Sequence, residues 1–182
     1  MKVISGFLKG RNIEGYNIDG TRPTMDRVKE SLFATIQNSI DNAIVLDLYA
    51  GTGSLGIEAI SNGATKAYFI DNNKICIQCI DKHIALFNIS DKTETYCMND
   101  IDALKMFKEK NCVFDIVFLD PPYKYDSIPK IISFITNNKL LKKDGLIICE
   151  LTNTGLIKEY DNLKIIKNKK YSDKYIIIYK NI

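Results

Sequence analysis

From residue 43 onward, short apolar runs alternate with longer stretches in which apolar residues recur every three or four positions. Runs of the first kind predict buried strands, and stretches of the second kind predict amphipathic helices. The predicted strands cover residues 43–49, 66–71, 93–99, 114–119 and 145–151. The predicted helices extend from a glycine turn to residue 61 and over 73–88, 101–110 and 127–139, with a short one near 155–160. Strands that alternate with helices in this way indicate a parallel sheet with helices on both faces.

The two ends of the chain depart from this alternation. Residues 2–20 mix β-forming residues with glycines, among them Gly6, Gly10 and Gly15, and predict a β-hairpin. The loop "TRPT" (21–24) leads into a predicted helix from Met25 to about Ser39, with Thr24 as its N-cap. The last two predicted strands, 163–168 and 174–180, are joined by only a few residues, which indicates an antiparallel hairpin at a sheet edge. We therefore expect an N-terminal extension (1–24) and one α/β domain (25–182).

The composition is that of one ordinary domain. The chain has 182 residues, of which 46% are apolar and 26% charged, enough for a sizeable core. Its start is apolar for only a few residues before Lys9 and Arg11, which is unlike a signal peptide. No apolar run approaches the roughly 18 residues of a membrane span. We expect a cytoplasmic protein without a membrane segment and, for lack of an obvious extra apolar face, a monomer.

The five cysteines and the single histidine raise the question of a metal site. Cys76, Cys79 and His83 could form a cluster, but they also fall on one apolar face of the helix predicted over 73–88. No second Cys/His pair completes a tetrahedral set of ligands. We therefore expect no metal.

The net charge of +3 is mild, but the arginines are unevenly placed. Arg11, Arg22 and Arg27 are the three arginines of the chain, against 22 lysines. Arginine is suited to bidentate phosphate contact, but also to fixed ion pairs within a protein. Both interpretations stay open for these three residues.

A glycine turn, "DLYAGTGSLGIEA" (47–59), follows the first strand of the domain and opens a helix. Gly51, Gly53 and Gly56 match GxGxxG, and Asp71 ends the next strand, where an acid can accept hydrogen bonds from ribose hydroxyls. This pattern alone would suit NAD. Asp47 favours S-adenosylmethionine instead, because a carboxylate there repels a diphosphate and stabilises an ammonium or sulfonium group.

A further acid follows the third strand of the domain. Asp100 is placed to accept a hydrogen bond from an adenine amine, although Asp100 and Asp102 could instead be N-caps or first-turn acids of the next helix.

The motif "DPPY" (120–123) ends the apolar strand 114–119. Ligands in parallel sheets sit beyond the carboxyl ends of the strands. Asp120 and the Pro121 carbonyl can each accept a hydrogen bond from an exocyclic amine, which holds the nitrogen for attack on a methyl group, and the prolines make this turn rigid. Asp120 also offsets positive charge on the attacked nitrogen, and Tyr123 offers a ring on which a base can stack. Alternatively, the turn only ends a strand.

Together these motifs resemble the RsmD-type methyltransferases. The resemblance covers the whole chain and rests on "ISGFLKGRNI" (4–13), "TRPTMDRVKESLF" (21–33), "DLYAGTGSLGIEA" (47–59), "ID" (70–71) and "FLDPPY" (118–123). The N-terminal motifs point to this family most specifically. Asp71 stands where many relatives carry Glu.

The resemblance implies a Rossmann-like fold, a seven-stranded mostly parallel sheet with an antiparallel edge strand, and an N-terminal β-hairpin that grips RNA. It implies S-adenosylmethionine-dependent methylation of N2 of one guanine, guanine 966, in 16S rRNA of assembled small ribosomal subunits. The implied cofactor-binding residues are Asp47, Tyr49, Ala50, Gly51, Thr52, Gly53, Asp71, Asn72, Asp100 and Ile101. The implied catalytic residues are Asp120, Pro121, Pro122 and Tyr123, and the implied RNA contacts are Lys9, Arg11, Arg22, Thr24 and Arg27.

Three other functions compete with this one. An adenine-N6 methyltransferase acting on DNA or RNA would use the same DPPY motif. A non-catalytic RNA-binding protein could retain the fold, but the acids Asp47, Asp71 and Asp120 argue against it. An NAD dehydrogenase is disfavoured by Asp47 and by the position of His83 on a helix away from the strand ends.

Overall fold

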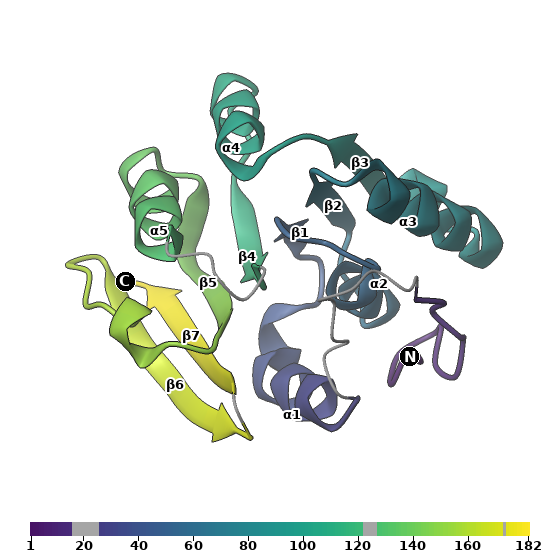
Figure 1. Cartoon of the computed structure of the whole chain (residues 1–182), viewed down its shortest axis with the longest axis horizontal. Coiled ribbons are helices and arrows are strands. Elements are labelled where there is room, and N and C mark those ends of the chain that lie inside the picture. The colour runs from purple at the N-terminus through teal and green to yellow at the C-terminus, as the bar shows by residue number, and fades with distance from the viewer. Residues whose placement is uncertain (16–25, 122–126, 173) are drawn as a thin grey trace.

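The computed structural model describes residues 1–15, 26–121, 127–172 and 174–182. Its centre is a seven-stranded sheet with the strand order β3-β2-β1-β4-β5-β7-β6 (Figure 1). The strands are β1 (Ile44–Asp47), β2 (Lys66–Asp71), β3 (Thr93–Cys97), β4 (Phe114–Leu119), β5 (Leu141–Leu151), β6 (Leu163–Tyr171) and β7 (Lys174–Asn181). The order reverses direction between β1 and β4, which is the point where ligands bind in open α/β sheets.

The strand directions confirm the predicted mostly parallel sheet. Strands β1 to β5 pair in parallel, whereas β7 is antiparallel to both β5 and β6. The predicted antiparallel hairpin is thus present at one edge. The second strand of this hairpin, β7, pairs with β5 and is antiparallel to it. The antiparallel strand therefore lies one position in from the edge, and β6 forms the edge of the sheet.

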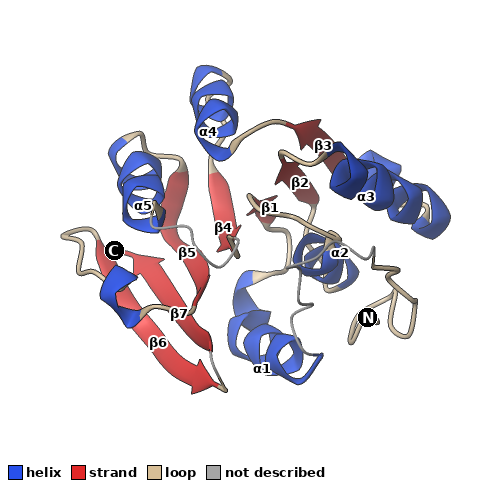
Figure 2. Cartoon of the chain, in the orientation of Figure 1, coloured by secondary structure: helices blue, strands red, loops and turns tan. Residues whose placement is uncertain are grey.

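Helices cover both faces of the sheet (Figure 2). They are α1 (Asp26–Ile36), α2 (Ser54–Ser61), α3 (Lys74–Phe87), α4 (Asp100–Glu109) and α5 (Ile128–Asn137), with short 3₁₀ turns η1 (Gln37–Ser39), η2 (Ser90–Lys92) and η3 (Thr154–Leu156). Apolar residues of α1, α2 and α3 pack on one face in one buried cluster, and those of α4 and α5 pack on the other face in a second cluster. None of the helices among the described residues is both long and apolar enough to cross a membrane.

Within the domain, strand β5 and the helix predicted near 155–160 differ most from their predictions. Strand β5 begins at Leu141 rather than at residue 145, because Leu141 still pairs with Phe114 across a register shift. Asp144, with a φ of 63°, lies within this irregular start. Residues 142–144 are polar, so the hydrophobic pattern did not indicate a strand there. The helix predicted near 155–160 is only the 3₁₀ turn η3, in which Gly155, a poor helix former, donates to the Asn153 side chain at 2.9 Å.

The predicted N-terminal hairpin is reduced to one bridge within the described residues. Lys2 and Asn12 form this antiparallel bridge, and the Val3 amide donates to the Arg11 carbonyl at 2.9 Å. Residues 16–20 of the predicted hairpin and the loop 21–24 lie outside the described residues.

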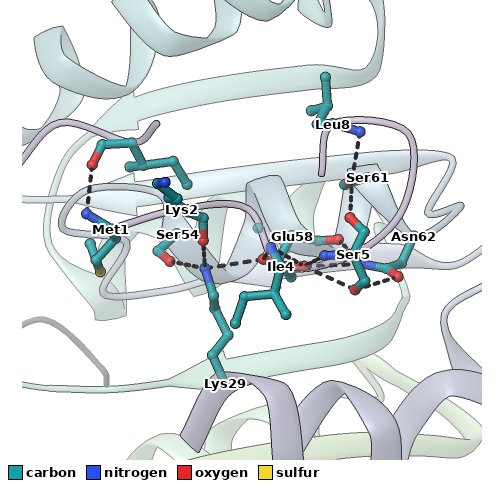
Figure 3. Close-up of polar contacts among 12 residues, drawn as sticks. Met1, Lys2, Ile4, Ser5, Leu8, Lys29, Ser54, Glu58, Ser61 and Asn62 are labelled. Carbon is teal, nitrogen blue, oxygen red and sulfur yellow. Dashed lines mark hydrogen bonds and ion pairs between the residues drawn. The ribbon is translucent and has the colours of Figure 1, made fainter. Parts of the chain in front are cut away.

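A buried polar cluster attaches this N-terminal segment to the domain (Figure 3). The Glu58 carboxylate on α2 accepts from the amides of Ile4, at 2.9 and 3.0 Å, and of Ser5, at 2.8 Å. The Lys29 ammonium on α1 lies 3.0 Å from the same carboxylate and donates to the Lys2 carbonyl at 2.7 Å. Glu58 belongs to α2, the helix that follows the glycine turn. The N-terminal segment is therefore hydrogen-bonded to the same helix that carries the candidate site.

Candidate active site

Acidic side chains follow one another along the carboxyl edge of the parallel strands. Asp47 pairs in register with Phe69 of β2 and with Phe118 of β4. Since side chains alternate between the two faces of a strand, Asp71, two residues beyond Phe69, points to the same face as Asp47. Asp120 lies two positions beyond Phe118, just after the end of β4, and its charge also acts on Asp47. That face is covered by α1, α2 and α3. The sheet therefore brings together three acids that lie far apart in the sequence.

The glycine turn joins β1 to α2 at the same edge of the sheet. Gly51 and Gly53 have φ values of 54° and 77°, in the left-handed region where glycine carries no steric cost. The Gly51 amide donates to Asp71 Oδ2 at 2.9 Å, and the Ala50 amide donates to the Ile70 carbonyl at 2.9 Å. The turn is thereby tied to the end of β2. Asp71 also accepts from the Asn73 amide at 2.8 Å, at the start of α3.

Gly56 is required for close packing and not, like Gly51 and Gly53, for a left-handed backbone conformation. A Cβ atom on Gly56 would lie 2.3 Å from Cε1 of Phe69 on β2. The Gly56 amide also donates to Asp47 Oδ2 at 3.1 Å. The third glycine of the motif thus lets α2 approach the sheet and orients Asp47, rather than making room for a ligand.

Asp47 has a strongly raised pKa. Its side chain is buried, and this burial raises its pKa from 3.8 to about 7. The Gly56 amide lowers this pKa, whereas the nearby charges of Asp120 and Asp71 raise it further. A buried carboxylate among other acids is a poor place for a phosphate and a favourable one for a cation.

The remaining predicted cofactor residues border the same edge. Tyr49 donates its hydroxyl to Asp100 Oδ2 at 2.7 Å, which joins the loop after β1 to the start of α4. Asp100 is the first residue of α4, and its Oδ1 also accepts from the Ile101 amide at 2.6 Å. The N-cap of α4 is Asn99, so Asp100 is a first-turn acid that also faces the loop after β1. Thr52 is half-buried in the glycine turn, and Asn72 is exposed after β2.

This set of groups fits S-adenosylmethionine. A buried acid suits its cationic methionine part, an acid at the end of β2 suits ribose hydroxyls, and an acid at the start of α4 suits an exocyclic amine. A carboxylate has about four lone-pair positions, so an acid such as Asp71, which accepts from the amides of Gly51 and Asn73, can also accept hydrogen bonds from a ligand.

The DPPY turn is described only in its first half. Asp120 and Pro121 are half-buried just beyond β4, while Pro122 and Tyr123 lie outside the described residues. Asp120 lines a small hollow together with a second carboxylate, that of Glu150 near the end of β5. The other lining side chains are apolar: Leu32, Leu55, Leu119, Ile148 and Ile176.

The sequence analysis did not single out Glu150, although this residue lines the hollow beside Asp120. The signal was present, because Glu150 ends the apolar run 145–149 as Asp47, Asp71 and Asp120 end theirs. Glu150 belongs to no recognisable motif, so the sequence pattern indicated only a strand at this position.

The predicted RNA-contacting residues are only partly described. Lys9 and Arg11 are exposed on the N-terminal segment, and Arg27 is exposed in the first turn of α1. Arg22 and Thr24 lie outside the described residues.

The cysteine–histidine group on α3 also contacts the N-terminal segment. His83 Nε2 accepts from the Glu14 amide at 3.0 Å, and Cys79 Sγ lies 3.9 Å from His83 Nδ1. Burial lowers the pKa of His83, which is consistent with a neutral ring that accepts this hydrogen bond. In the described part of the chain, no group of three or more His, Cys, Asp or Glu residues could hold a metal ion.

The sheet order, the glycine turn and the row of acids define the class of Rossmann-like methyltransferases. The family model "Conserved hypothetical protein 95" matches residues 1–180. The chain belongs to this family, the RsmD family, as its motifs predicted.

Individual relatives agree with this assignment. "Ribosomal RNA small subunit methyltransferase D" of Haemophilus influenzae is 34% identical over 170 residues, which cover 93% of this chain and 88% of that protein. The protein of the same name from Escherichia coli K12 is 31% identical over 150 residues, which cover 82% of this chain and 74% of that protein. The solved structure of yhhF from Escherichia coli superposes with a TM-score of 0.87 at 28% identity, covering 100% of this chain and 97% of that one. An RNA methyltransferase of Salinibacter ruber, solved with S-adenosyl-L-homocysteine, shares the fold with a TM-score of 0.67 at 12% identity, covering 88% of this chain and 94% of that one.

Proposed function

We propose that this protein is an S-adenosylmethionine-dependent rRNA methyltransferase that modifies the N2 amine of one guanine in 16S rRNA. The observation that carries the proposal is the closeness of Asp47, at the end of β1, to Asp120, just beyond the neighbouring strand β4: the charge of Asp120 raises the pKa of Asp47. This arrangement sets an acid suited to a cationic methyl donor beside an acid suited to an amine. The relatives named "Ribosomal RNA small subunit methyltransferase D" support the substrate class.

Asp47, Asp71 and Asp100 would hold the cofactor, together with the backbone of the glycine turn at Gly51 and Gly53. When bound, S-adenosylmethionine supplies an electrophilic methyl group. Asp47 would face the ammonium of its methionine part, because a buried carboxylate gains most from a fixed opposite charge. Tyr49, Ala50, Thr52, Asn72 and Ile101 would complete the walls around it.

Asp120 and Pro121 would position the target amine. The lone pair of an exocyclic amine is delocalised into the ring of the base, so this nitrogen is a weak nucleophile. Two acceptors, the Asp120 carboxylate and the Pro121 carbonyl, would bind its two hydrogens and orient the lone pair. The Asp120 charge would offset the positive charge that develops on nitrogen. Tyr123, known only from its place in the motif, would stack on a base extruded from the RNA.

The exposed cations at the N-terminal end would bind the RNA backbone. Lys9 and Arg11 lie on a segment that Glu58 fixes to α2, and Arg27 lies at the start of α1. Arg22 and Thr24 are assigned to the same surface from the sequence motif. An assembled small subunit as substrate would require the protein to work in the cytoplasm.

The test is to map methylated nucleotides in 16S rRNA by mass spectrometry, in a strain that lacks this gene. We expect one guanine, guanine 966 by family resemblance, to lose its N2 methyl group. Purified protein with S-adenosylmethionine should restore it on isolated small subunits. Restoration of a methyl group on adenine N6, or an unchanged methylation map in the deletion strain, would refute the proposal.

A further inference from the structure

Asp120 lies just beyond the end of β4, and Glu150 lies near the end of the adjacent parallel strand β5. The pairs Phe118–Ile148 and Leu119–Cys149 are in register between β4 and β5. Asp120 and Glu150 are the residues that come directly after this last pair. Neighbouring strands lie about 4.8 Å apart, and residues in register point to the same face. Both carboxylates line the same hollow, which agrees with this register.

The Glu150 carboxylate is held in place by Lys174. Glu150 is only 8% exposed. Its Oε1 forms an ion pair with Lys174 Nζ, from the first residue of β7, and β7 lies beside β5 (Figure 1). Removing two charges from water is costly, and replacing such a pair by apolar side chains is often neutral or stabilising. The stability of the fold therefore does not by itself explain why a charged pair lies beside the candidate amine site.

The chemistry of guanine suits this pair. Next to its N2 amine, guanine presents a second donor, N1–H, and then an acceptor, O6. Adenine and cytosine each present an acceptor nitrogen next to their exocyclic amine. An ionised carboxylate only accepts hydrogen bonds, and an ammonium only donates them.

We infer that Glu150 and Lys174 select guanine, with the Glu150 carboxylate accepting from N1–H and the Lys174 ammonium donating to O6. This inference rests on the proposed function, because it requires that the N2 amine is bound by Asp120 and Pro121. With adenine or cytosine in that position, a ring acceptor would face the Glu150 carboxylate. Two facing acceptors repel each other, so the same residue that binds guanine would exclude the other bases.

The test compares rates of methyl transfer to small subunits reconstituted with guanine, adenine or 2,6-diaminopurine at the target nucleotide. Diaminopurine keeps the 2-amine but has an acceptor at N1 and an amine in place of O6. We expect the wild-type protein to prefer guanine over diaminopurine. Glu150→Gln can present its amide NH₂ to an N1 acceptor. It should lower the rate on guanine by about 10- to 100-fold, the size of one charge-assisted hydrogen bond, and reduce the preference at least tenfold.

A double variant guards against loss of folding. Glu150→Gln with Lys174→Met removes both charges of the buried pair together, which leaves no uncompensated charge. It should lose at least as much preference as Glu150→Gln, because the donor to O6 is also removed, and its affinity for S-adenosylhomocysteine should be unchanged. The control is Lys180→Met, near the other end of β7. It breaks the 2.8 Å ion pair between Lys180 and Asp144 of β5 and should change neither the rate nor the preference.

The outcomes separate this inference from the proposed function. A wild-type protein that methylates guanine N2, with variants that keep the full preference over diaminopurine, would overturn the role of Glu150 alone. A wild-type protein that methylates the adenine substrate instead would overturn the proposed function and this inference together.

Discussion

Lys29 of α1 and Glu58 of α2 form an ion pair at 3.0 Å in which neither side chain is exposed (Figure 3). Lys29 also donates to Ser54 Oγ at 3.0 Å, in the first turn of α2. The Glu58 carboxylate accepts from the backbone of the N-terminal segment at Ile4 and Ser5. One buried pair thus connects α1, the helix of the glycine turn and the N-terminal segment.

Breaking this pair should strongly destabilise the protein. Lys29→Met leaves a buried carboxylate without its cation, and the loss of one partner of a buried pair costs about 3–5 kcal/mol. Glu58→Gln should cost a similar amount, because it leaves the Lys29 ammonium uncompensated. Urea unfolding at pH 7 measures both free energies of unfolding.

The double variant Lys29→Met with Glu58→Gln should lose clearly less than the sum of the two single variants, because no isolated charge remains. Losses below about 1 kcal/mol in both single variants, as for exposed ion pairs, would show that the pair contributes little.

Gly56→Ala should also destabilise the fold, although alanine is usually the better helix former by about 1 kcal/mol. The new Cβ would lie 2.3 Å from Cε1 of Phe69, so α2 or the ring must move. Overpacking of this kind typically costs about 1–3 kcal/mol. Phe69→Leu should restore part of the lost stability in the double variant. Thermal unfolding of the four proteins tests this, and a Gly56→Ala variant that melts above the wild type would contradict it.

Much of the fold was predictable because it depends on local patterns. Strands β2 and β4 have the predicted bounds, 66–71 and 114–119, since both are apolar runs between clear breaks. Asp47, Asp71 and Asp120 were predicted as acids at strand ends, because each follows such a run within a recognisable motif. Glu150 follows a similar run without a motif and was not predicted. The start of β5 was missed, since a register shift and three polar residues interrupt its pattern.

Long-range polar contacts could not be predicted in the same way. Lys29 is one of 22 lysines, and nothing in its neighbourhood marks it as buried. Its partner, Glu58, is 29 positions away and comes close only once α1 and α2 pack on the same face of the sheet. Similarly, the hydrogen bond from the Glu14 amide to His83 depends on a segment that precedes the whole domain.

The raised pKa of Asp47 should make both stability and cofactor binding depend on pH. The folded-state pKa is about 7, above the ordinary 3.8, so the folded protein holds this proton more tightly than the unfolded chain. Asp47 therefore contributes stability that is complete below about pH 3.8 and is lost as the pH rises through about 7. In the protein without cofactor, Asp47→Asn should remove this contribution.

A bound cation favours the ionised form of Asp47, so binding of S-adenosylhomocysteine should release a proton. Its affinity should fall about tenfold for each pH unit below about 7 and level off above. Calorimetry in two buffers of different ionisation enthalpy measures the released proton directly. Asp47→Asn should bind more weakly and without this pH dependence. A wild-type affinity that is constant between about pH 5.5 and 8 would exclude the assigned role.

The exposed arginines should govern the salt dependence of RNA binding. Arg11→Ala and Arg27→Ala should each lower the slope of log K against log salt by about one unit, because each phosphate contact releases about one counterion. Cofactor affinity should be unchanged. Lys108→Ala serves as the control, since Lys108 is exposed on α4, which covers the other face of the sheet. If the arginine variants keep the wild-type slope but melt earlier, the arginines are structural.

Asp120 should matter for methyl transfer and not for cofactor binding. Asp120→Ala removes one acceptor for the amine and the charge beside the attacked nitrogen, and the loss of one such preorganised group costs about 100- to 1000-fold in rate. Asp120→Asn keeps an acceptor oxygen without the charge, so its rate should fall between those of the wild type and Asp120→Ala. Single-turnover methylation of small subunits measures the rate, with S-adenosylhomocysteine affinity measured alongside at pH 8, where Asp47 is ionised in both proteins. Asp91→Ala, an exposed acid in η2, is the matched control. A wild-type rate in Asp120→Ala would mean that the DPPY turn only ends β4.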